Sequence, residues 1–228
     1  MRIWCAVPIL AGAISIAATQ APRRVAVDFT DLDATFQDRL GALPRFDSLI
    51  ASELHSAGFE IVPPDSTAAL WNAGVDSVGG LFDTYTGDLL TGKRAAVRER
   101  TLHQLRTHFG ATVWLHPEIT QKAVKFKGSK VTWDGTTEKT GASGGVIKAL
   151  FGSDEGTMQV LSLEIVAENM AGQVIYQSAA GIQLLSKVHG ESLRDVIATM
   201  ILTDADRNAA AVHAALAGLP VALKDSTP

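Results

Sequence analysis

The clearest pattern in the chain is an alternation of apolar and polar residues over positions 157–188. In its first arm, four apolar side chains share one side and are separated by polar ones: Leu161, Leu163, Ile165 and Ala167. A period of two is typical of a strand with one buried face. A second arm alternates in the same way over 174–184, and Gly172 between the arms can supply the positive φ of a short turn. The pattern predicts a long antiparallel hairpin with one face on a core.

Apolar spacing elsewhere predicts the elements that surround this hairpin. In chain order they are strand 24–29, helix 46–57, strand 59–62, a short helix from Ser66, helix 93–108, strands 112–126 and 131–140, the long hairpin, and a helix opened by Ser192. The last helix would bury five apolar side chains: Leu193, Val196, Ile197, Met200 and Ile201. This order predicts an α/β fold with a β-α-β start, an antiparallel-rich mixed sheet with helices packed on it, and a C-terminal helix.

Composition is that of a globular protein. The chain has 228 residues, of which 46% are hydrophobic and 19% charged, and its formal net charge is −4. These values predict one folded domain over 22–228, with a loop or insertion at about 74–92 that is rich in Gly, Asp and Thr. An acidic chain is not expected to attract nucleic acid.

The first 21 residues have the pattern of a secretory signal peptide. Arg2 precedes an apolar run over 3–18, and small residues follow at Thr19 and Ala21. Cleavage after Ala21 would deliver a periplasmic or secreted protein without cysteine, because Cys5 lies within the signal. The alternative is an uncleaved anchor, since the apolar run is close to the length that spans a bilayer.

Four strings resemble a family of bacterial envelope proteins. They are VAVDF at 25–29, the segment 49–63, FGATVW at 109–114 and AENMAGQVIY at 167–176. With the element order, they are similar to the domain shared by the curli-secretion channel lipoprotein (CsgG-like) and the TolB amino-terminal domain, and to uncharacterised secreted proteins of related type. The resemblance implies a non-catalytic module that binds or assembles with envelope proteins. An acylated cysteine and a second long apolar hairpin are missing, so neither outer-membrane attachment nor a channel is implied.

A serine hydrolase is the first alternative. Residues 141–145, GASGG, match the G-x-S-x-G turn that presents a nucleophilic serine, here Ser143. Asp195 and His213 follow in the chain order that an acid and a base would need. The preceding segment is polar where a buried central strand is expected, and glycines at this density are also typical of a flexible loop.

A module that binds a small ligand or metal is the second alternative. Asp28, Asp31 and Asp33 follow the first strand, where carboxylates can hold a cation, but their spacing is not that of a calcium loop. The histidines are scattered, and His103 with His108 lacks the i, i+4 spacing of helical zinc ligands. His116 is predicted to be a hydrogen-bonded residue at a sheet end. No metal or cofactor is expected.

Two surfaces are candidate binding sites. Four lysines surround Phe126 and could bind an anionic ligand, although lysines also protect exposed strand edges: Lys122, Lys125, Lys127 and Lys130. In the segment 74–92, three apolar side chains must either cover the core or meet a partner: Leu81, Phe82 and Tyr85. The favoured hypothesis is a non-catalytic accessory protein with an envelope protein as partner; self-association is left open.

Overall fold

A parallel β-α-β unit opens the fold, as the sequence predicts. The computed structural model describes residues 23–141, 144–189 and 192–225. Strand β1 (Arg24–Val27) is followed by α1 (Leu43–Ser56) and by β3 (Glu60–Val62), which pairs with β1 in parallel. Helix α1 turns the side chains of Phe46, Ile50 and Leu54 into the core at helical spacing. The predicted signal peptide lies outside the described residues.

Two strands of 15 residues each form the centre of the sheet. They are β4 (Val113–Lys127) and β7 (Glu155–Asn169), which pair in antiparallel register along their whole length. Strand β4 also pairs in parallel with β1, and β7 pairs with β8 (Val174–Leu184). The main order is therefore β3-β1-β4-β7-β8, which confirms the predicted mixed sheet and its long hairpin.

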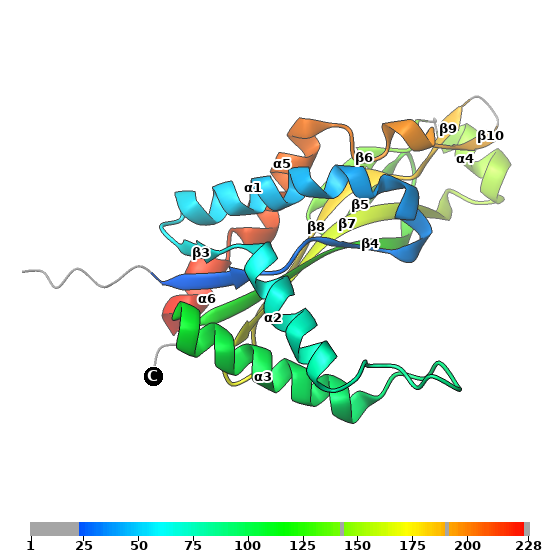
Figure 1. The fold of residues 1–228 in the computed structure, drawn as a ribbon. Helices are drawn as coiled ribbons and strands as arrows, with labels where there is room; N and C mark the ends of the chain where they lie inside the picture. Colours follow the sequence, from blue (N-terminus) through cyan, green and yellow to red (C-terminus); the bar gives the residue numbers. More distant parts are fainter. Residues whose placement is uncertain (1–22, 142–143, 190–191, 226–228) are drawn as a thin grey trace, which may run out of the picture.

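Helices cover both faces of this sheet and give three layers (Figure 1). On one face lie α1, α5 (Ala205–Leu216) and α6 (Leu219–Asp225), and on the other lie α2 (Pro64–Ser77) and α3 (Thr91–Phe109). Strand β1 shows the separation: Val25 and Val27 pack in the first layer, whereas Ala26 packs in the second. The alternation of strand side chains thus supplies both cores.

Short elements complete the fold. They are β2 (Asp31–Leu32), the 3₁₀ segment η1 (Ala34–Ala42), β5 (Lys130–Trp133), β6 (Thr136–Lys139), α4 (Gly144–Phe151), β9 (Ser186–His189), β10 (Ser192–Asp195) and η2 (Ala198–Met200). Helix α4 and the β5–β6 hairpin enclose a second apolar cluster with the ends of β4 and β7.

The prediction of one buried face on the long hairpin is therefore incomplete. Near its open end, Leu161 packs against the main core while Val160 and Met158 on the opposite face pack in the second cluster. Polar Ser162 and Gln183 are buried there as well. The turn follows the prediction: Gly172 has φ 76°, and the Asn169 side chain accepts hydrogen bonds from the backbone N–H groups of Ala171 and Gln173.

The predicted helix beginning at Ser192 is wrong. Residues Ser192–Asp195 form β10, which pairs with β9, and the side chains of Leu193, Ile197 and Met200 are exposed. The helix begins at Ala205 instead, because the Asp204 side chain caps it by accepting the backbone N–H of Arg207. The segment 192–201 therefore has the apolar spacing of an α-helix but forms β10 and the short 3₁₀ turn η2 instead.

Candidate functional site

The segment between α2 and α3 forms a projecting hairpin, which we call the 81–90 hairpin. It is shorter than the predicted 74–92, because α2 continues to Ser77 and α3 begins at Thr91. Phe82 and Leu89 form an antiparallel bridge, and the Leu90 N–H donates to the Leu81 carbonyl over 2.7 Å. Figure 1 shows this segment extending beyond α2 and α3, away from the sheet.

Asp83 organises the tip of the 81–90 hairpin. Its Oδ1 accepts the backbone N–H groups of Tyr85, over 2.8 Å, and Thr86, over 3.0 Å. The hydrogen bonds from Thr86 and then Tyr85 stabilise the carboxylate and lower the pKa of Asp83. The Asp83 N–H also donates to the Asp88 carbonyl over 2.8 Å. These hydrogen bonds fix the backbone conformation of the turn at the tip.

This hairpin displays large apolar side chains to solvent. Phe82 is 61% exposed and Tyr85 97% exposed, and Leu89 opposite Phe82 is 38% exposed. The sequence left open whether Leu81, Phe82 and Tyr85 cover the core or meet a partner. Phe82 and Tyr85 do not cover the core. Leu81 is half-buried at the base. The sequence did not identify Leu89 as part of this surface, because only the bridge between the two arms of the hairpin brings it beside Phe82.

The base of the hairpin is held by close packing of its two flanking helices. A Cβ added at Gly74 of α2 would lie 2.9 Å from a methyl group of Val97 in α3, so the small residue permits the approach. Thr101 and Leu102 of α3 are buried, and Leu105 is fully enclosed. The hairpin is consequently presented by a helix pair that is fixed on the sheet.

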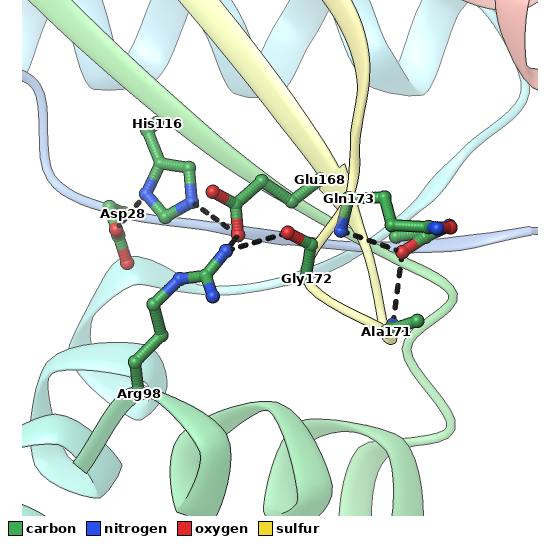
Figure 2. A network of polar contacts seen from close by, with 8 residues as sticks. Asp28, Arg98, His116, Glu168, Ala171, Gly172 and Gln173 are labelled. Carbon is green, nitrogen blue, oxygen red and sulfur yellow. Dashed lines mark hydrogen bonds and ion pairs between the residues drawn. The ribbon is translucent and has the colours of Figure 1, made fainter. Parts of the chain in front are cut away.

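A polar network joins α3 to the sheet, and Figure 2 shows four of its side chains: Asp28, Arg98, His116 and Glu168. The Asp28 carboxylate follows β1 and accepts two hydrogen bonds over 2.7 Å each, from Trp114 Nε1 and from His116 Nδ1. Because a carboxylate only accepts, the proton of a neutral His116 lies on Nδ1. The hydrogen-bonded role predicted for His116 is confirmed, but its partner was not foreseen.

Arg98 of α3 connects this network to the turn of the long hairpin. Its guanidinium forms an ion pair with Glu168 and donates to the Gly172 carbonyl over 2.9 Å (Figure 2). Glu168 Oε2 lies 4.0 Å from His116 Nε2, a buried atom that has no hydrogen-bond partner among the described residues. The two contacts of Arg98 thus tie α3 to β7 and to the turn that follows it.

Arg98→Met is expected to reduce the free energy of unfolding by about 1–3 kcal/mol, because it leaves the largely buried Glu168 carboxylate without its ion-pair partner. The control is Arg106→Met on the same helix, which should change stability by less than about 0.5 kcal/mol because Arg106 is exposed. Urea unfolding of the purified variants measures both. Equal losses for the two would contradict a specific role for Arg98.

The four predicted anion-binding lysines do not form one free patch. Lys122 Nζ lies 2.9 Å from Asp134 Oδ2 and 3.0 Å from Glu164 Oε1. Burial opposes its charge, but these two carboxylates outweigh burial and raise the pKa of Lys122. Lys127 pairs with Glu155 over 3.0 Å. Lys125 and Lys130 are exposed and have no carboxylate partner in the described part of the chain.

The acid and base of the predicted hydrolase triad, Asp195 and His213, have different partners and do not pair with each other. The His213 imidazole lies on α5 and contacts Glu53 Oε1 over 2.8 Å, whereas Asp195 is exposed in β10 and pairs with Ser186. Ser143 lies outside the described residues. The nucleophile remains a prediction from the motif alone.

The carboxylates after the first strand are dispersed along the edge of β4. Asp31 and Glu118 are paired across β2 and β4, and Asp33 caps η1 through the N–H of Thr35. Burial, followed by the charges of Asp31, Glu164 and Asp33, raises the pKa of Glu118. Over residues 23–141, 144–189 and 192–225, no three His, Cys, Asp or Glu side chains are arranged to hold a metal ion.

Comparison with known protein families and curated proteins found no match. Within the described ranges, none of the helices has the length and apolar character needed to cross a membrane.

Proposed function

We propose that this chain is a non-catalytic periplasmic or secreted accessory protein that binds an envelope protein through the 81–90 hairpin. The observation that carries the proposal is the exposure of Phe82 and Tyr85 on a turn whose backbone is fixed by Asp83. Exposed aromatic side chains on an ordered support are typical anchors of protein interfaces, because little entropy is lost when they become buried.

The charges of the hairpin favour a protein partner over a lipid surface. Asp83 and Asp88 belong to the same hairpin as the two aromatic side chains and are followed along the chain by Lys93 and Arg94 in α3. An anionic bilayer presents one sign of charge and would repel the two carboxylates. A protein can instead place an apolar pocket against the rings and basic groups against Asp83 and Asp88.

The compartment and the kind of partner rest on sequence. The signal-peptide pattern over 1–21 supports export. The resemblance to CsgG-like and TolB amino-terminal domains supports an envelope partner, and a β-α-β start with an antiparallel-rich sheet is compatible with it.

Replacing both rings, Phe82→Ala with Tyr85→Ala, is expected to reduce co-purification of the envelope partner by at least about tenfold, because central aromatic anchors each contribute about 2 kcal/mol or more. Stability should change by less than about 0.5 kcal/mol, since the side chains touch solvent. The control is Val221→Ala on α6, where the side chain is also 61% exposed.

The proposal is abandoned if crosslinking in cells, followed by purification, recovers no envelope protein with the unaltered chain. It is also abandoned if the double variant and the Val221→Ala control retain a partner equally well.

A further inference from the structure

Strand β8 forms one edge of the main sheet, and only half of that edge is covered. It pairs with β7 on its inner side. On its outer side, the Gly181 N–H donates to the Asp134 carbonyl over 3.0 Å, and the Gly181 carbonyl accepts the Thr136 hydroxyl over 2.9 Å. The β5–β6 turn therefore caps the edge at Gly181 and leaves residues 176–179 outside its reach.

The outward bonds of Gly181 establish which backbone groups of β8 face away from β7. Pairing with β7 is regular from Tyr176 to Gly181, and backbone direction alternates along a strand, so Ala179 and Gln177 also face outward. No hydrogen bond reaches their backbone N–H or C=O groups from any residue that the structure describes. Gln177 is exposed, and Ala179 is half-buried.

This free edge lacks the usual protection against strand pairing. Residues 174–186 contain no charged residue and no proline. The opposite edge of the sheet, β3, is only 3 residues long, carries the Glu60–Arg24 ion pair and is followed by Pro63. Edge strands of soluble proteins are commonly blocked by such charges, prolines or short lengths, so the neutrality of β8 indicates a strand that is covered in use.

We propose that β8 pairs with β8 of a second copy of this chain, antiparallel about a two-fold axis at Ser178. Gln177 then exchanges both of its backbone hydrogen bonds with the partner's Ala179, and Ala179 does the same with the partner's Gln177. The two residues whose backbone groups face outward, Gln177 and Ala179, lie symmetrically about Ser178. A two-fold axis at Ser178 therefore brings each of them opposite the other in the second copy. Because the segment is uncharged, two copies approach it without repulsion, although each chain is acidic overall.

Substitutions on the outer edge separate pairing from folding. Ala179→Pro removes an outward N–H that makes no bond within the chain, and Gln177→Lys places a charge on the edge. Sedimentation velocity of the purified chain is expected to show a dimer that either change weakens at least about tenfold. Thr107→Lys on the exposed side of α3 is the matched charge control and should leave the dimer intact.

A cysteine at the symmetry axis tests the register. The Ser178 pair would be a non-hydrogen-bonded pair with Cα atoms about 4.5 Å apart, a separation that a disulfide can bridge. In a chain with Cys5→Ser, Ser178→Cys should give an oxidised, covalent dimer, whereas Gln183→Cys, whose side chain is buried, should not. A monomeric unaltered chain, or a dimer insensitive to both edge substitutions, overturns the proposal.

Discussion

Leu163→Ala is expected to lower the free energy of unfolding by about 3–5 kcal/mol, the upper range for a fully enclosed leucine. Leu163 is completely buried at the middle of β7, where it lies opposite Ile119 of β4 and Ala180 of β8. The two neighbouring strands would border the cavity, and the regular pairing on both sides would hinder its collapse. Urea unfolding followed by circular dichroism measures the loss.

A matched truncation on the same hairpin controls for the strand itself. Val174→Ala at the start of β8 removes an exposed side chain and should cost less than about 0.5 kcal/mol. If Leu163→Ala cost no more than this control, the long hairpin would not be the centre of the core.

Gly181→Ala is expected to destabilise the fold by about 3 kcal/mol, although it adds one methyl group. A Cβ at this position would lie 2.6 Å from Trp133 Nε1 and 2.7 Å from Thr136 Cβ. Both neighbours belong to the β5–β6 hairpin, which is bonded to Gly181 through its backbone. Overpacking of this kind forces side chains and backbone to shift.

Gly145→Ala provides the contrast for this substitution. Gly145 lies in α4, and a Cβ there would meet no other atom within 4 Å. Its replacement should be neutral or slightly stabilising, because alanine favours a helix over glycine by up to about 1 kcal/mol. Thermal unfolding of both variants distinguishes the two sites, and a stable Gly181→Ala variant would refute the close contact with Trp133.

Local patterns were sufficient to predict most of the fold. Alternation identified the long hairpin, and the apolar stripe of Phe46, Ile50 and Leu54 identified α1, because both patterns follow the geometry of single elements. The same reasoning failed over 192–201, where the apolar spacing suits an α-helix but residues 192–195 pair with β9 as a strand. That pairing depends on tertiary contacts, which a periodicity does not contain.

The candidate sites also differ in whether they depend on local sequence or on tertiary contacts. The 81–90 hairpin was a candidate from sequence because Phe82 and Tyr85 stand out in a polar, glycine-rich segment, but the sequence left open whether they cover the core. The network of Asp28, His116 and Arg98 was not, since Asp28 and His116 are 88 positions apart and meet only through parallel pairing of β1 and β4. Nor could spacing reveal that Lys122 is neutralised by Asp134 and Glu164.

The most direct test of the proposed function is photocrosslinking in cells from position 85, with a benzophenone amino acid in place of Tyr85. The proposal predicts a discrete adduct with an envelope protein, lost on Phe82→Ala and absent when the same probe replaces Val221. No adduct from position 85, or the same adducts from both positions, would contradict binding through the 81–90 hairpin.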